Sequence, residues 1–200
     1  METTAHERAE IASGLRSALS ATGLTQEAFA RLLGTSRPRL SAYLNGRTMP
    51  SAALYLRALR TANALQSARL HGWMTPDATS TEVNEALAAG DEAWAFKMII
   101  QARDHLATML DAGNPAADAW LLRSLTITDP RYDALLAAVV AHEFEQHDPS
   151  RTPEWTKTPP LRTDWIQPNL RRGVDWTRTH TPTWLARRGI YISTHDLQTA

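Results

Sequence analysis

Apolar residues recur at three- and four-residue intervals along most of the chain, which is the period of an amphipathic helix. Glycine, proline and capping residues interrupt this pattern at intervals and mark the helix ends. The predicted helices span residues 6–20, 26–33, 37–45, 51–62, 65–71, 82–89, 91–112, 116–124 and 129–147. The pattern therefore predicts an all-α fold for the first three quarters of the chain.

The segment Thr25–Gly46 has the most specific pattern, because it predicts two short helices joined by a tight turn. Thr25 is a good N-cap for the first helix, and Leu24 with Phe29 forms the apolar pair of a hydrophobic staple. Gly34 is placed to end that helix as a C′ glycine.

Ser36 can cap the second helix of this pair, in which Leu40 supplies the inward face. Arg37 and Arg39 then point outward at its N-terminal end, followed by small residues. A helix of this shape fits a DNA major groove about 12 Å wide. A helical hairpin with a solvated basic face is the simpler alternative.

At these residues the sequence resembles the Xre/Cro-type helix-turn-helix family of transcriptional regulators. The resemblance rests on L-T-Q-x-x-x-A-x-x-L-G at 24–34, T-S-R at 35–37 and N-G-R at 45–47, and it covers roughly residues 7–64. It implies a DNA-binding domain that we expect to contain five helices. It also implies a homodimer on double-stranded DNA, at a pseudo-palindromic operator.

The resemblance also implies the residues of the DNA interface. Base edges would be read by the start and outer face of the second helix, that is by Arg37, Pro38, Ala42, Arg39 and Ser41. Phosphates would be held by Gln26, Ser36, Asn45 and Arg47. Arg39 could serve either role. Because Pro38 and Ala42 replace the longer polar residues frequent in the family, direct readout would rest mostly on Arg37.

The net charge of zero conceals a strongly uneven distribution along the chain. Residues 1–73 hold nine basic and four acidic side chains, residues 74–148 hold four and thirteen, and residues 149–200 hold eight and four. We therefore expect a basic DNA-binding domain at 1–73, with residues 73–80 as its linker. An acidic helical bundle for dimerisation or docking would follow at 74–148, and a basic C-terminal segment at 149–200.

The C-terminal segment is rich in proline and contains four of the seven tryptophans of the chain. Short helices are predicted at 169–179 and 183–188, one short strand at 189–193, and a final turn capped by Ser193. Because disordered segments are poor in aromatic residues, we expect this segment to be ordered. Two interpretations remain open: it wraps its own bundle, or it binds a partner.

The motif T-P-x-W-L-A-R-R-G-I-Y-I at 181–192 resembles, less specifically, the C-terminal signature of actinobacterial antitoxins encoded beside nucleotidyltransferase-type toxins. This resemblance implies an antitoxin that neutralises a toxin and represses its own operon. Its candidate toxin contacts are Trp176, Trp184, Arg187 and Arg188, residue types that dominate interface energetics. The alternative is a stand-alone or phage-type repressor that responds to a ligand and has no toxin partner.

Nothing in the sequence predicts an enzyme, a metal site or a cofactor. His142 and His147 are five residues apart, so their imidazoles point about 140° apart on a helix and do not form the H-E-x-x-H zinc pair. The chain has no cysteine, which excludes disulfides and thiolate ligands. No apolar run is long enough to span a membrane, and we expect a cytoplasmic protein.

Overall fold

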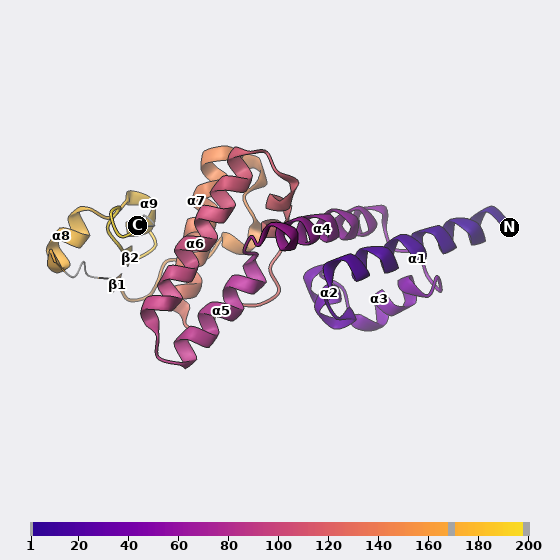
Figure 1. The fold of residues 1–200 in the computed structure, drawn as a ribbon, viewed down its shortest axis with the longest axis horizontal. Helices are drawn as coiled ribbons and strands as arrows, with labels where there is room; N and C mark the ends of the chain where they lie inside the picture. The colour runs from indigo at the N-terminus through magenta and orange to yellow at the C-terminus, as the bar shows by residue number, and fades with distance from the viewer. Residues whose placement is uncertain (1, 168–170, 198–200) are drawn as a thin grey trace. The chain divides into compact units, whose positions relative to one another are not determined.

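The computed structural model describes residues 2–167 and 171–197, which group into two compact units. One unit extends to Trp73 and also contains Asn114–Ser124, while the other contains Met74–Gly113 and the chain from Leu125 onward (Figure 1). Within the described residues the fold is all-α, as the sequence predicts, except for one pair of two-residue strands. The compact units thus have different boundaries from the three charge blocks of the sequence.

The first unit contains four α-helices, which are α1 (Glu2–Thr22), α2 (Gln26–Leu32), α3 (Arg37–Leu44) and α4 (Ala52–His71). Thr25, Ser36 and Ser51 cap α2, α3 and α4 through their side chains, as expected. The separate helix predicted at 65–71 is instead the end of α4, because no glycine or proline interrupts that helix before Gly72. The core consists mainly of Leu15, Phe29, Leu33, Leu40, Leu44, Ala58 and Ala62.

A short 3₁₀ helix from the middle of the chain, η1 (Pro115–Leu121), completes the first unit. It packs against α4, and Thr61 of α4 lines a small hollow together with Asp118 and Leu121 of η1. Trp120 of η1 is fully buried. The α-helix predicted at 116–124 in the acidic bundle is therefore wrong in type and in placement.

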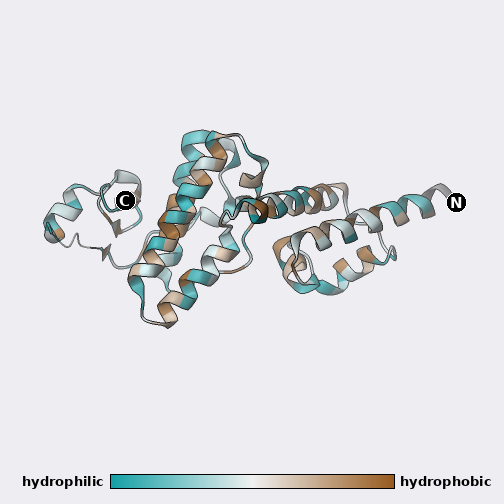
Figure 2. Cartoon of the chain, in the orientation of Figure 1, coloured by the Kyte–Doolittle hydropathy of each residue, from teal (hydrophilic) through white to brown (hydrophobic). Residues whose placement is uncertain are grey.

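The second unit begins with three helices, α5 (Pro76–Ala88), α6 (Glu92–Asp111) and α7 (Pro130–His147). Asp129 caps α7, as predicted, and Asp91 caps α6 at the predicted start of that helix. Apolar and hydrophilic residues interleave along α6 (Figure 2). α5 begins earlier than predicted, because Thr75 is its N-cap and Pro76 occupies its first position. The predicted linker at 73–80 is consequently mostly helical.

The C-terminal segment of the second unit contains short elements only: η2 (Pro149–Arg151), η3 (Glu154–Thr156), β1 (Trp165–Ile166), α8 (Gly173–Thr179), α9 (Thr183–Ala186) and β2 (Ile190–Tyr191). β1 and β2 pair in parallel, with Trp165 opposite Ile190. The predicted strand at 189–193 is confirmed in its centre, and its partner β1 was not predicted. The predicted helix start at residue 169 lies outside the described residues.

Candidate nucleic-acid interface

The start of α3 is held in place by local capping and by its buried face. The Ser36 side chain accepts a hydrogen bond from the Arg39 backbone N–H at 3.4 Å, and Pro38 occupies the first turn, where its missing N–H costs no helical hydrogen bond. Leu40 and Leu44 are buried in the core of the unit. The first turn of α3 is therefore fixed and points to solvent.

The turn between α2 and α3 depends on Gly34. Its φ of +71° is in the left-handed region, and the Thr35 N–H donates to the Ala30 carbonyl at 2.9 Å. A Cβ added at Gly34 would meet no atom within 4 Å, so the requirement for glycine is conformational and not one of space. The same type of closure ends α3, where Gly46 has a φ of +65° and the Arg47 N–H donates to the Ala42 carbonyl.

Three arginines of this unit are used to hold helix ends together. Arg16 donates to the Leu44 carbonyl at the end of α3 at 2.5 Å. Arg57 and Arg69 make the equivalent bonds to the carbonyls of Leu33, at 3.4 Å, and Ala21, at 3.2 Å. A positive charge at a helix C-terminus is favourable because it faces the negative end of the helix dipole.

The sequence pattern did not reveal these three contacts. The bond from Arg16 joins residues 28 positions apart, so no local signal could have identified it. Part of the basic charge of residues 1–73 thus has a structural role.

A second group of exposed arginines makes no such bond to a helix end. Arg37, Arg39 and Arg47 are exposed, and within the described residues none of their side chains has a hydrogen-bonding or ionic partner. Arg31, in contrast, pairs with Glu27 at 3.3 Å on the surface of α2. Both ends of α3 therefore carry exposed positive charge without a polar partner among the described residues.

The remaining predicted DNA contacts differ in accessibility. Pro38, Ser36 and Asn45 are exposed, and the side chain of Asn45 donates to the Ser41 carbonyl at 2.8 Å. The half-buried residues among the predicted contacts are Gln26, Ser41 and Ala42. All of them lie on α2, on α3 or beside these helices, and their roles in DNA contact stay predictions.

The four predicted partner contacts in the C-terminal segment do not form one exposed surface. The Trp184 ring stacks on that of His142 of α7, with centroids 4.2 Å apart and planes 9° apart. Arg188 donates to the Thr156 carbonyl at 3.0 Å, and burial lowers its pKa. Arg187 is exposed and Trp176 is half-buried. Trp184 therefore holds the segment onto α7, and Arg188 joins two parts of the segment itself, which favours the wrapping interpretation.

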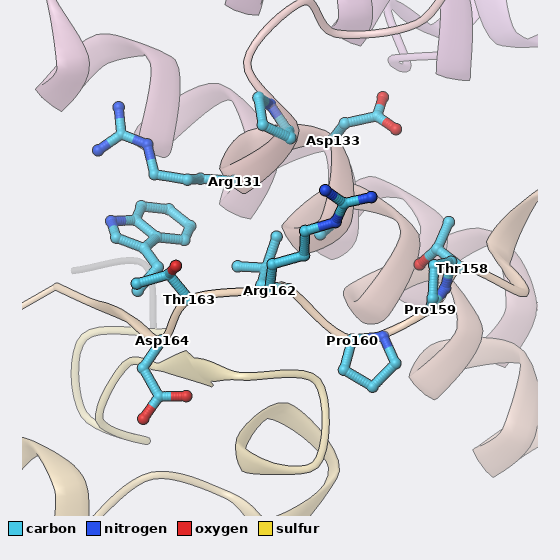
Figure 3. A pocket seen from close by; sticks show the side chains of 12 residues that line it. Arg131, Asp133, Thr158, Pro159, Pro160, Arg162, Thr163 and Asp164 are labelled. Atoms are coloured by element: carbon cyan, nitrogen blue, oxygen red, sulfur yellow. The ribbon is translucent and has the colours of Figure 1, made fainter.

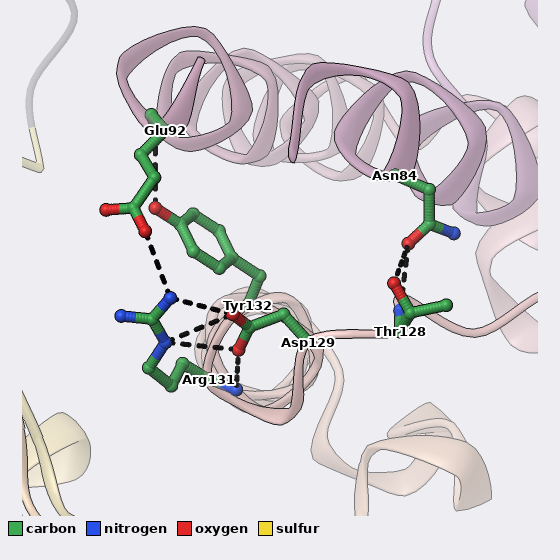
Figure 4. A network of polar contacts seen from close by, with 6 residues as sticks. All are labelled: Asn84, Glu92, Thr128, Asp129, Arg131 and Tyr132. Carbon is green, nitrogen blue, oxygen red and sulfur yellow. Dashed lines mark hydrogen bonds and ion pairs between the residues drawn. The ribbon is translucent and has the colours of Figure 1, made fainter. Parts of the chain in front are cut away.

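A polar network joins the three long helices of the second unit (Figure 4). Arg131 contacts Asp129 at 2.7 Å and Glu92 at 3.1 Å, which links α7 to the start of α6. The Asn84 side chain of α5 accepts hydrogen bonds from the backbone N–H and the hydroxyl of Thr128. The hydrogen bond from the Arg131 side chain holds the pKa of Asp129 below its ordinary value.

The second unit also contains a hollow of about 770 Å³ between the start of α7 and the proline-rich segment 158–165 (Figure 3). Pro130 and Ala134 line one side, and Pro159, Pro160 and Leu161 line the other. Its mostly apolar lining and its size lie in the range of small-molecule sites.

The first unit is a helix-turn-helix domain: residues 10–71 match the family model described as a helix-turn-helix domain. The matched range contains α2, the turn at Gly34 and α3, and it is less than half of the chain. The chain is accordingly similar to DNA-binding regulators that carry this domain. Among curated proteins and among solved structures, no significant match to the chain was found. No helix within the described residues is both long and apolar enough to cross a membrane.

Proposed function

We propose that this chain is a sequence-specific transcriptional repressor that binds a pseudo-palindromic operator as a homodimer. The observation that carries the proposal is the exposed first turn of α3, where Arg37 and Arg39 have no polar side-chain partner within the described residues. Arginine bidentate to guanine is the commonest specific base contact, and a fixed helix start gives it a defined direction. A dimer would place two copies of α3 in successive major grooves about 34–36 Å apart.

Binding to the chain's own promoter tests this proposal. Fluorescence anisotropy with a labelled promoter duplex should give tighter binding than with a scrambled duplex of equal length, at the same salt concentration. Arg60→Ala is the matched control for Arg37→Ala. Arg60 is also an exposed arginine of the first unit, but it lies on α4 and not on α3, which packs against α1 and α2. Equal affinity for both duplexes would contradict sequence-specific binding.

The finer proposal is that the repressor is the antitoxin of a type II toxin-antitoxin pair, which neutralises a nucleotidyltransferase-type toxin and autoregulates its operon. Its support is the resemblance of residues 181–192 to such antitoxins, together with the exposure of Arg187. Co-expression with the product of the adjacent reading frame should yield a complex that co-elutes at low salt. Arg187→Ala should weaken that complex while leaving promoter binding unchanged. Separate elution at low salt would overturn the antitoxin proposal and leave the repressor proposal standing.

A ligand-responsive repressor without a toxin partner is the second candidate, and the hollow of about 770 Å³ beside α7 favours it. A small apolar ligand bound there should raise the melting temperature of the protein in a ligand panel. An Ala134→Trp variant, which would fill the hollow from α7, should lose that shift. An unchanged melting temperature across the panel would count against this candidate.

A further inference from the structure

A second hollow in the C-terminal segment has a chemical character different from that of the first. It is a cleft of about 660 Å³ between α8 and residues 194–195. Its basic lining residues are Arg171, Arg172, His180 and His195, with Trp176 and Thr194 between them. None of the described residues that line this cleft carries a side-chain carboxylate. The cleft thus gathers cationic and hydroxyl groups within one unit of the protein.

The position of His180 in this cleft is fixed by its neighbours. Its Nδ1 lies 2.8 Å from the Trp176 carbonyl, and its ring stacks on the indole with centroids 4.1 Å apart. Because a carbonyl only accepts hydrogen bonds, Nδ1 carries the proton of that bond. Nε2 then has no polar partner within the described residues, and it can donate when the ring is protonated.

The opposite wall of the cleft is tied to the same residue. The backbone N–H and the hydroxyl of Thr194 both donate to the His180 carbonyl, at 3.0 Å and 3.1 Å. These bonds hold residues 194–195 against the end of α8, so both walls keep their spacing without a ligand. Preorganisation of this type lowers the entropy cost of binding.

Arg172 is placed by the same tryptophan from the other end of α8. Its guanidinium lies 5.0 Å from the centroid of the Trp176 ring, within the range of a cation–π contact. On the other side of the cleft, Asp196 lies 3.9 Å from Nδ1 of His195, and it accepts a hydrogen bond from the Ser193 hydroxyl at 2.7 Å. Arg172 therefore brings a positive charge to the cleft in a fixed position.

We propose that this cleft binds a phosphate-bearing small molecule of about the size of a nucleotide. Guanidinium groups match phosphate oxygens in a bidentate geometry, and Nε2 of His180 supplies a further donor when the ring is protonated. The volume lies within the range of about 300–1,000 Å³ that is usual for small-molecule sites. The site would give the repressor a phosphorylated effector, and its existence does not depend on operator binding or on a toxin.

Calorimetry on the full chain with ATP, GTP and inorganic phosphate tests the proposal. We expect saturable binding of at least one nucleotide, and Arg172→Gln should weaken it by roughly 10-fold or more, the effect of losing one charge-assisted hydrogen bond. Arg162→Gln is the matched control, because it removes an exposed arginine of the same segment that lines the other hollow. The control should stay within about 2-fold of the wild type, well below the 10-fold expected for loss of such a bond.

Two further measurements keep the test decisive. His180→Gln serves as a second variant if Arg172→Gln disturbs folding, which circular dichroism would reveal. Competition by inorganic phosphate would support a phosphate subsite, and weaker binding of phosphate alone would support a nucleotide. No binding of any probe at about 1 mM, the weak end of the affinity scale, would overturn the proposal. Equal loss in the Arg162 control, or displacement only by duplex DNA, would overturn it too.

Discussion

In the helix-turn-helix unit, Arg16, Arg57 and Arg69 donate to the final carbonyls of neighbouring helices, and the arginines of α3 remain exposed. In the C-terminal segment, Arg178 pairs with Asp164 at 3.1 Å and Arg188 donates to backbone and hydroxyl oxygens. Both regions are basic, but the net charge of a region does not show which of its arginine side chains already have a hydrogen-bonding or ionic partner. A surface that can bind phosphate is therefore identified by the partner of each guanidinium group, and not by the net charge of its region.

The largest expected effect distinguishes the cores beneath these two basic regions. Phe29 is fully buried below α3, so Phe29→Ala should lower the free energy of unfolding of the first unit by about 3–5 kcal/mol. Leu185→Ala removes an equally buried side chain from the C-terminal segment and is the matched control. Urea denaturation followed by circular dichroism, with promoter binding in parallel, measures both. Only the Phe29 variant should lose promoter binding through unfolding, and equal binding losses in both variants would contradict independent cores.

The next effect concerns the free arginines of α3. Arg37→Ala should cost about 1–3 kcal/mol of operator binding, and it should relax the preference at one base pair of each half-site. The loss should leave non-specific binding much less affected, because a single base contact is removed. Anisotropy on a set of operators substituted at single positions measures this selectivity, with Arg60→Ala as the control. An equal loss on every sequence would assign Arg37 to phosphate instead.

A smaller effect is expected in the network of the second unit, where an arginine is paired and not free. Asp129→Ala removes both the N-cap of α7 and the partner of Arg131, and it should cost about 0.5–2 kcal/mol. Asp129→Asn keeps a capping side chain and removes only the charge. Urea denaturation at pH 7 measures both variants, and a cost confined to the alanine variant would mean that the charge contributes nothing.

The pH dependence of the same network has a defined sign. The pKa of Asp129 is lowered from its ordinary 3.8, mainly by the hydrogen bond from Arg131. Its charge therefore contributes stability above pH 3.8, and this contribution is lost as the pH falls through the lowered folded pKa. The wild type and Asp129→Asn should accordingly converge in stability under acid conditions. A constant difference between them across this range would contradict the assignment.

The smallest expected effect is that of Arg47, at the other end of α3. Arg47→Ala should weaken binding to all sequences alike, because a phosphate contact carries no sequence information. The plot of log affinity against log salt concentration should lose about one unit of slope, the value for one phosphate contact. An unchanged slope would remove Arg47 from the interface and would reduce the contrast between α3 and the C-terminal segment.

Local features of the fold were predictable from the sequence, because their signals lie within a few residues. Thr25, Ser36, Ser51, Asp91 and Asp129 each accept a hydrogen bond from the first turn of the predicted helix. The start of α5 was missed although its signal is local as well. Thr75 followed by Pro76 is a stronger helix start than Thr81, whose hydroxyl bonds back to the Asp77 carbonyl within the helix.

Features that join distant residues were not predictable in this way. The bond from Arg16 to Leu44, the packing of η1 on α4 and the pairing of β1 with β2 each depend on the completed fold. The features of the candidate interface therefore fall into two groups, those that local sequence signals predict and those that they do not. The exposure of Arg37 and Arg39 followed from helical periodicity, whereas the structural use of Arg16, Arg57 and Arg69 did not.

The placement of η1 has a consequence for the modularity of the protein. The chain leaves the first unit after Trp73, returns to it at Asn114 and leaves it again after Ser124. The chain therefore crosses between the two units three times, and no single protease cut at a crossing yields either unit as an intact, separate fragment. A fragment ending at Trp73 would also uncover the surface of α4 against which η1 packs. This DNA-binding unit is thus discontinuous in sequence. A single recombination junction therefore cannot transfer it intact into another protein.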